Sequence, residues 1–239
     1  MNIRGKKEVI NEDCSSCEIA GGALCIAHDT LEKLQLTKDV IHFKKGDFLF
    51  QRDQKSIGFF FLKKGIVRCY RSLPNGKEQT FHLKAKGDWV GFRDTIANTA
   101  YNHSSVCVDD VEACFIPKEL LEEMIQKDPN FQSLIFQQMA KEWRESENHV
   151  LSLGTKQVHS KLAELLITLH RSSSSSDFIE LKITREVLAS IIGTKTETLV
   201  RALSDLKARN WISVDKNRIL IKDLDSLKHL SELDLEPAT

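Results

Sequence analysis

The stretch 184-TREVLASIIGTKTETLVRALSDLKARNWISV-214 decides the fold of the C-terminal third of the chain. Thr184 is suited to cap a short helix, because its hydroxyl can accept a hydrogen bond from a free backbone N–H. The apolar face of that helix would comprise Val187, Leu188 and Ile191. Gly193 then permits a sharp turn, since glycine tolerates a positive φ.

A second helix is predicted directly after this turn. Residues 194–197 read Thr-Lys-Thr-Glu, the Thr-x-x-Glu form of a capping box. The core face of this helix would comprise Leu199, Leu203 and Leu206, and Asn210 would end it. Two short strands around residues 215–217 follow. Helix, glycine-containing turn, helix and hairpin together predict a winged helix-turn-helix.

The local charge agrees with a nucleic-acid partner. The whole chain has 34 basic and 34 acidic residues, but the part from Lys182 to Arg218 holds eight basic residues against four acidic ones. Such a patch can displace counterions from phosphates. The first turn of the second helix would enter the major groove, where Glu197 can accept from cytosine and Arg201, one turn later, can pair with guanine. The alternatives are a helix cap for Glu197 and a solvated charge for Arg201.

Residues 40–117 predict short antiparallel strands closed into a barrel or roll. Apolar runs there are broken by turn signals, and the Asn75-Gly76 pair between two such runs is typical of a hairpin. From Lys118 the period becomes helical, with a short helix ending at Asp128-Pro129. The fold class is therefore α+β.

A long helix is predicted over residues 130–153, which contain neither glycine nor proline. Its apolar positions share roughly one face, and a helix of this kind can pair with a second copy of itself. The candidate dimer contacts are Ile135, Met139, Trp143 and Val150. The alternative is that this face packs on the chain's own β-domain.

Composition narrows the setting. With 41% hydrophobic and 28% charged residues the chain is globular, and it has no membrane-spanning run or secretory signal at its start. We therefore expect a cytoplasmic protein with no membrane partner, in which thiols stay reduced. The sequence CSSCEIAGGALC at residues 14–25 then favours metal binding or redox sensing. Disulfide, zinc and iron–sulfur readings all remain, because three cysteines leave a four-coordinate metal one ligand short.

The chain resembles the CRP/FNR family of bacterial transcription regulators from Cys14 to about Ile221. Four segments carry the resemblance: FKKGDFLFQRDQKSIGFFFLKKGIVRCY at residues 43–70, GDWVGF at 87–92, CFIPKELLEEM at 114–124 and ETLVRAL at 197–203. The resemblance implies a cyclic-nucleotide-binding-like β-roll, a dimerisation helix and a DNA-binding winged helix-turn-helix. The expected divisions are residues 1–28 for the cysteine segment, 29–117 for the roll, 118–152 for the dimer helix and 153–239 for the DNA-binding domain.

The FNR branch of the family implies an oxygen-labile 4Fe–4S cluster on three N-terminal cysteines and one at the end of the roll. The matching residues are Cys14, Cys17, Cys25 and Cys114. Structural zinc would accept the same four thiolates, and Cys107 is a rival for the fourth position. Cys69, within a strand pattern, is expected to be a small buried residue.

The CRP branch binds cyclic AMP through a Gly-Glu turn and an Arg-Ser pair. Here Gly91 is followed by Phe92, and His103 stands where the arginine would be. Cyclic AMP is therefore not expected, whereas another small effector stays open. A zinc or thiol redox switch is the alternative function. An enzyme is not expected, since the chain has no nucleotide-binding glycine motif.

The resemblance also implies a homodimer on a two-fold-symmetric DNA site, with RNA polymerase as a partner. FNR-type recognition helices usually read Glu-x-x-Ser-Arg, but here Val200 replaces the serine. A valine can contact a thymine methyl group but cannot hydrogen-bond, so one base preference should differ. The candidate DNA-binding residues are Lys195, Thr196, Glu197, Val200 and Arg201.

Overall fold

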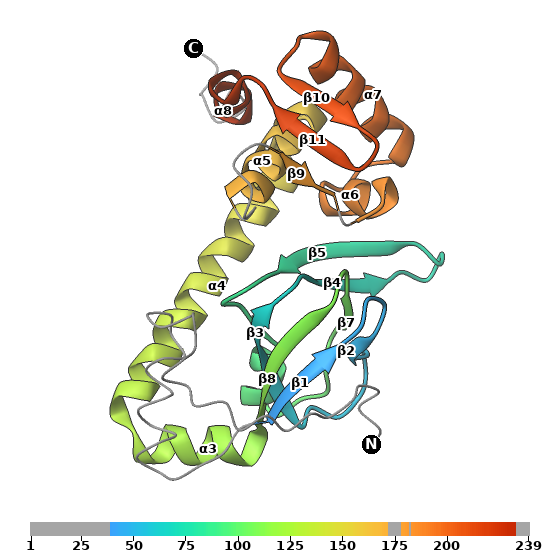
Figure 1. Cartoon of the computed structure of the whole chain (residues 1–239). Helices are drawn as coiled ribbons and strands as arrows, with labels where there is room; N and C mark the ends of the chain where they lie inside the picture. Colours follow the sequence, from blue (N-terminus) through green and yellow to red (C-terminus); the bar gives the residue numbers. More distant parts are fainter. Residues whose placement is uncertain (1–38, 172–177, 182, 233–239) are drawn as a thin grey trace. The chain divides into compact units, whose positions relative to one another are not determined.

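The computed structural model describes residues 39–171, 178–181 and 183–232 (Figure 1). They form two compact units, the first ending at Trp143 and the second beginning at Arg144. This limit lies inside a helix, whereas the predicted divisions fall at residues 117/118 and 152/153. The cysteine segment of residues 14–25 and the serine run of residues 172–176 lie outside the described residues.

The first unit is built from two four-stranded antiparallel sheets, as the predicted β-roll requires. The first sheet has the order β1-β8-β3-β6. Its strands are β1 (Asp39–Phe43), β3 (Gly58–Lys64), β6 (Trp89–Val90) and β8 (Val111–Pro117). The second sheet has the order β2-β7-β4-β5. Its strands are β2 (Phe48–Phe50), β4 (Val67–Ser72), β5 (Glu78–Lys84) and β7 (Ser104–Cys107).

Consecutive strands often change sheet. β1 pairs with β8, whereas β2 pairs with β7, and the same exchange occurs between β3 and β4. A true hairpin joins β4 to β5 at the Asn-Gly signal. Gly76 has a φ of 76° there, and the Lys77 N–H donates to Asn75 Oδ1 over 3.1 Å. The predicted hairpin is therefore confirmed.

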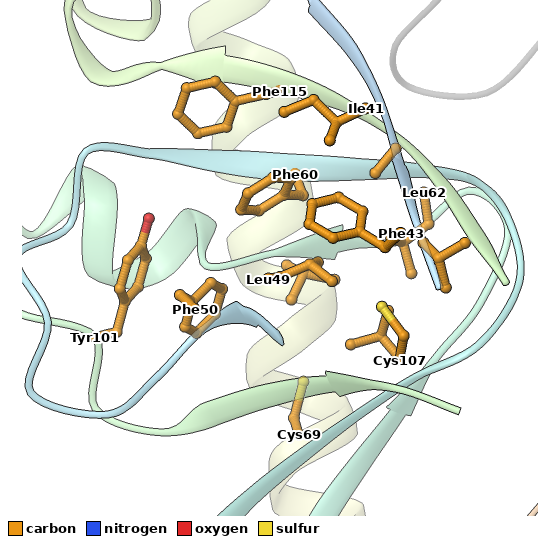
Figure 2. Packing of buried hydrophobic residues seen from close by; sticks show 14 residues of the cluster. Ile41, Phe43, Leu49, Phe50, Phe60, Leu62, Cys69, Tyr101, Cys107 and Phe115 are labelled. Carbon is orange, nitrogen blue, oxygen red and sulfur yellow. The ribbon is translucent and has the colours of Figure 1, made fainter. Parts of the chain in front are cut away.

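An aromatic core, the inter-sheet cluster, fills the space between the two sheets (Figure 2). The Phe43 and Phe60 rings meet edge to face with centroids 5.7 Å apart. Phe50 stacks on Tyr101 at 3.8 Å. These rings come from strands of both sheets or from the segment before β7, so their burial closes the roll.

A second core, the helix-side cluster, covers the opposite face of the first sheet. Side chains alternate along β8, so Cys114 and Ile116 face this cluster while Ala113 and Phe115 face the inter-sheet cluster. The first sheet also contributes Val40, Phe59, Phe61 and Trp89, and α2 (Phe92–Ile96), α3 (Lys118–Lys127) and the start of α4 (Pro129–Thr155) supply the rest. The short helix ending at Asp128 and the long helix after it are thus confirmed.

The second unit contains the predicted winged helix-turn-helix. Its helices are α5 (Val158–Arg171), α6 (Arg185–Ile191), α7 (Thr196–Ala208) and α8 (Leu224–Glu232). Its strands are β9 (Ile179–Glu180), β10 (Ile212–Asp215) and β11 (Arg218–Ile221), in the order β10-β11-β9. None of the described helices is long and apolar enough to cross a membrane.

Of the two predicted N-caps of the helix-turn-helix, the one of α6 is confirmed and the one of α7 is wrong. Thr184 caps α6 as predicted, with its side chain accepting from the Val187 N–H. The capping box predicted at residue 194 is wrong, because the N-cap of α7 is Lys195, which makes no side-chain cap hydrogen bond. The Thr194 N–H instead donates to the Ala189 carbonyl over 3.0 Å and closes the end of α6. Thr194 is therefore committed to the preceding helix.

Candidate DNA-binding and sensory sites

The α7 helix separates its core and solvent faces cleanly. Leu199 and Leu206 are 0% and 1% exposed, and Leu203 is buried beside them. Lys195, Glu197, Val200 and Arg201 are exposed, and Thr196 is partly exposed. Val200 is 45% exposed, so an apolar group stands on the surface among charged side chains. All five predicted DNA-binding residues thus lie at the N-cap or in the first turns of α7, with side chains that are exposed or partly exposed.

Several contacts fix the direction of α7. Gly193 adopts a φ of 66° in the turn, and Asn210 ends the helix with a φ of 61°, as the sequence predicted. His159 of α5 lies 2.9 Å from the Asp205 carboxylate on the outer side of α7. The Trp211 N–H donates to the Leu206 carbonyl over 3.1 Å. The helix is therefore held at both ends and against α5.

The wing is tied to the first motif helix by a contact that sequence reasoning missed. The Arg185 guanidinium at the start of α6 donates to the Lys216 carbonyl at the tip of the β10–β11 hairpin over 3.3 Å. Arg218 of the same hairpin lies over the Phe178 ring at 4.6 Å. Lys216 and Arg218 are exposed. The wing thus presents two cations on a hairpin whose tip is held in place.

The α4 helix has a buried base and an exposed continuation. Phe131 and Ile135 are 1% and 4% exposed and belong to the helix-side cluster. Ile135, predicted as a dimer contact, is instead a core residue of its own chain, because α3 and the first sheet cover it. Met139, Trp143 and Val150 are exposed, and so is Phe136, which was not predicted.

The exposed side of α4 repeats every seven residues. Phe136, Trp143 and Val150 are 70%, 70% and 69% exposed. A seven-residue spacing keeps side chains on one seam of a two-stranded coiled coil. Large exposed apolar groups in such a row are characteristic of an interaction surface.

The three described thiols fall into two environments. Cys114 of β8 is 1% exposed, faces the helix-side cluster and lies opposite Val40 and Phe61 in register. Cys69 and Cys107 belong to the inter-sheet cluster, where both sulfurs are visible in Figure 2. Cys69 is thus buried as predicted.

Burial makes the two thiols of the inter-sheet cluster weaker acids. It raises the pKa of Cys69 to about 11 and that of Cys107 to about 12, with acidic neighbours adding to the second shift. Cys107 lies in the inter-sheet cluster, whereas Cys114 lies on the helix side of the first sheet, so the two thiols do not share a site. Within the described ranges, no group of three or more His, Cys, Asp or Glu side chains is placed to hold a metal ion. Cys14, Cys17 and Cys25 lie outside these ranges.

Comparisons with known proteins match both units. Residues 40–128 match the cyclic nucleotide-binding domain, and residues 160–230 match the Crp-like helix-turn-helix domain. The fumarate and nitrate reduction regulatory protein of Escherichia coli K12 is 26% identical over 91% of this chain and 90% of its own length. The nitrogen fixation regulation protein FixK of Bradyrhizobium diazoefficiens is 24% identical over 88% of this chain and 90% of its own length.

The fold agrees with solved structures of such regulators. FixK2 from Bradyrhizobium japonicum superposes with a TM-score of 0.77 at 21% identity, covering 85% of this chain and all of that one. A CRP/FNR family transcriptional regulator from Thermus thermophilus gives a TM-score of 0.69 at 20% identity, covering 81% of this chain and 98% of that one. The chain belongs to the CRP/FNR family. It is a transcription regulator with a DNA-binding helix-turn-helix, and its relatives are regulators, not enzymes.

In this CRP/FNR regulator, the two positions where the CRP branch would hold cyclic AMP are occupied by core residues. Phe92 is 2% exposed and packs edge to face on Trp89 at 4.6 Å. His103 is 5% exposed and lies edge to face against the Phe50 and Phe81 rings.

The His103 ring is neutral despite an acidic neighbour. Burial, reinforced by the Arg93 cation, lowers the pKa of His103 to about 3. Asp94, whose carboxylate is 3.6 Å away, would favour the charged ring, but burial raises the pKa of Asp94 as well. Burial outweighs the pair attraction because both groups lie away from water. These positions therefore offer neither a carboxylate for a ribose nor a cation for a cyclic phosphate.

Proposed function

We propose that this regulator is a DNA-binding homodimer that senses oxygen or redox state through a 4Fe–4S cluster held by Cys14, Cys17, Cys25 and Cys114. The sequence identity to FixK is about the same as that to the fumarate and nitrate reduction regulatory protein, so these relatives do not decide the effector. The choice of effector rests on the cysteines. The observation that carries the proposal is the place of Cys114 in the sheet. Four thiolates are the usual donor set for a 4Fe–4S cluster. When bound, the cluster would supply the chemistry that responds to oxygen.

The position of Cys114 fits this role. Its register partner is Val40, one residue after the described chain enters β1 at Asp39, and β1 is an edge strand of the sheet in the described part. The stretch from Cys25 to Asp39 can span at most about 50 Å. The described chain thus begins beside Cys114, and the sequence between Cys25 and Asp39 is long enough for the three cysteines to reach that thiol. Burial of Cys114 suits a cluster shielded from solvent.

The same thiol is connected to the dimer helix by packing. Cys114 shares the helix-side cluster with Phe131 and Ile135 at the base of α4. A change at the sulfur therefore alters the packing that supports α4. Further along α4, Met139, Trp143 and Val150 are exposed, and a second copy would pair there. This route makes α4 the element whose pairing the cysteine site biases.

DNA recognition would use the first turns of α7 in the major groove. Glu197 would accept from a cytosine, Arg201 would pair with a guanine, and Val200 would contact a thymine methyl. Lys195 and Thr196 would contact the adjacent backbone or bases. A dimer would present two such helices about 34–36 Å apart to a two-fold-symmetric site. RNA polymerase is the further partner.

Cyclic AMP is not the effector in this proposal. Phe92 and His103 fill the two positions with buried rings, one apolar and one neutral. A cyclic nucleotide would lose both of its charge-assisted contacts there.

The test is a visible spectrum with iron and sulfide analysis of protein purified without oxygen and then exposed to air. We expect about four irons per chain and a colour that bleaches in air. Cys114→Ser should lose the cluster and the oxygen response of DNA binding. Cys69→Ser, which changes a buried thiol of the inter-sheet cluster, is the matched control. Zinc in place of iron, or full regulation in Cys114→Ser, would refute the oxygen sensor and leave a zinc or thiol switch.

DNA reading is tested separately. Arg201→Ala should weaken binding to the specific site by about 1–3 kcal/mol and relax preference at one base pair. Arg209→Ala is the control, because Arg209 is exposed after the end of α7 and lies over the Trp211 ring at 5.0 Å. Equal losses in both variants would show that charge alone, not base reading, drives binding.

A further inference from the structure

The tip of the wing is a two-residue turn with an unfavourable backbone conformation. Asp215 of β10 pairs with Arg218 of β11, so Lys216 and Asn217 form the turn between them. Lys216 adopts a φ of 49°, a left-handed conformation that is unfavourable for a residue other than glycine because its Cβ crowds the following carbonyl. Contacts with other elements are therefore needed to hold the tip in this shape.

Both backbone carbonyls of the turn accept hydrogen bonds from outside the hairpin. The Leu181 N–H, just after β9, donates to the Asn217 carbonyl over 2.6 Å. The Arg185 guanidinium of α6 donates through Nη2 to the Lys216 carbonyl over 3.3 Å. The first contact joins the tip to the segment that follows its own neighbouring strand, whereas the second joins it to the helix-turn-helix. Arg185 thus connects the wing to α6.

The Arg185 guanidinium is turned toward the protein. Its Nη1 is buried and has no hydrogen-bond partner among the described residues, while Nη2 donates to the wing. Burial lowers the pKa of Arg185, but a guanidinium stays charged at neutral pH. Because both terminal nitrogens are directed into the protein, the side chain is placed to hold the wing and not to reach a phosphate itself.

This connection matters for DNA binding because α6 and the wing would meet the same duplex. In a helix-turn-helix, the second helix lies in the major groove while the first crosses the backbone. Lys216 and Arg218 of the wing are exposed, but the Arg218 guanidinium lies over the Phe178 ring at 4.6 Å. The ammonium of Lys216 is thus better placed to meet a phosphate. Phosphate contacts set the register of a protein on its duplex.

We propose that Arg185 is a positioning residue of the DNA interface, which holds the wing so that Lys216 meets a backbone phosphate beside the groove in which α7 lies. This inference rests on the proposed docking of α7, but not on which bases α7 reads. Arg185 and Lys216 should then act as one unit, because the effect of the first passes through the second. Two cations that each bound a phosphate would instead contribute independently.

The experiment is a double-mutant cycle on the full-length protein with Arg185→Met and Lys216→Ala. Methionine keeps an apolar stem like that of the arginine but cannot donate to the Lys216 carbonyl. Binding to a labelled duplex that wild type selects from a random-sequence pool is measured at several salt concentrations. Lys216→Ala should reduce the slope of log affinity against log salt by about 1, the loss of one phosphate contact. Arg185→Met should reduce it equally although Lys216 is still present, and the double variant should fall no further.

Two further variants serve as controls. Arg209→Met removes an exposed cation after the end of α7 and should leave the salt slope close to that of wild type. Arg185→Gln, whose amide is too short to reach the same carbonyl, replaces Arg185→Met in the cycle if circular dichroism shows that the methionine variant does not fold.

The outcomes separate this inference from the base reading proposed above. A slope that falls by about 2 in the double variant would show that Arg185 binds a phosphate itself and would overturn its positioning role. An unchanged slope in Arg185→Met or in Lys216→Ala would also overturn it. If the cycle behaves as expected while Arg201→Ala keeps the wild-type base preference, base reading fails and the role of Arg185 stands. If wild type selects no duplex, both fail together.

Discussion

The two halves of α4 make opposite use of the same apolar pattern. At its base, Phe131 and Ile135 are 1% and 4% exposed inside their own chain's core. Further along, Phe136 and Trp143 are each 70% exposed. Helical periodicity therefore reveals that a face is apolar, but not what covers it. An apolar residue of α4 that its own chain covers belongs to the core, whereas an exposed one is available to a partner.

The largest expected effect is on folding stability, from a substitution in the buried half of α4. Phe131→Ala should lower the free energy of unfolding by about 3–5 kcal/mol, because it removes a ring from a packed core and leaves a cavity. Chemical denaturation followed by circular dichroism measures the change. Phe136→Ala is the matched control and should move the stability of the unpaired chain by only about 0.5 kcal/mol. Equal destabilisation by both variants would erase the distinction between the halves.

The next largest effect is on dimerisation, from a substitution in the exposed half of α4. Trp143→Glu should weaken the dimer by about 2 kcal/mol or more, roughly 30-fold in its dissociation constant, because a buried interface would gain an unpaired charge. Sedimentation at several concentrations measures it. Asn148→Glu, an exposed substitution away from the 136–143–150 row, should leave the dimer intact. A Trp143→Glu protein that dimerises like wild type would show that the second copy binds elsewhere.

Acid should lower the folding stability of the first unit through the buried His103. His103 has a folded pKa of about 3 against 6.5 unperturbed, so the unfolded chain binds its proton first as pH falls. Its full contribution to stability is present above pH 6.5 and is lost progressively toward pH 3. Between pH 6.5 and 5 this should cost about 1.5 kcal/mol. Denaturant midpoints at both pH values, with His103→Phe as the flatter comparison, measure it; parallel curves would contradict it.

The smallest effect concerns an exposed residue of the second unit. Val200 is 45% exposed on α7, so Val200→Ser should change folding stability by no more than about 0.5 kcal/mol. It should instead alter preference at one base pair by about 1 kcal/mol, since a methyl contact is replaced by a hydroxyl. Competition binding across single-base variants of the site measures it. An unchanged preference profile would mean that Val200 does not touch a base.

Much of this architecture could be predicted where the signal is local. Thr184, Gly193 and Asn210 act through their own backbone geometry, so the motif they bound was predicted almost residue by residue. The cap at Lys195 was missed because Thr194 is equally suited to capping, and only its hydrogen bond to Ala189 commits it to the previous helix.

Long-range pairing could not be predicted in the same way. Nothing local states that β1 pairs with β8 across more than half of the first unit, yet this pairing sets His42 opposite Glu112 and Val40 opposite Cys114. Cys114 was proposed from a family pattern, whereas its partner Val40 on β1 follows from no local signal. Likewise, whether Ile135 or its neighbour Phe136 is buried depends on where α3 packs, and two adjacent apolar residues in the sequence do not reveal this.

The turn at Gly193 has a consequence for how the chain can diverge. A side chain there would be strained by the φ of 66°, and its first carbon would lie 3.1 Å from Leu153 Cδ2 in the last turns of α4. Two separate constraints thus fall on one position. In a saturation scan, Gly193 should tolerate fewer replacements than its exposed neighbour Lys195, and a smaller residue introduced at position 153 should relieve the contact but not the strained φ.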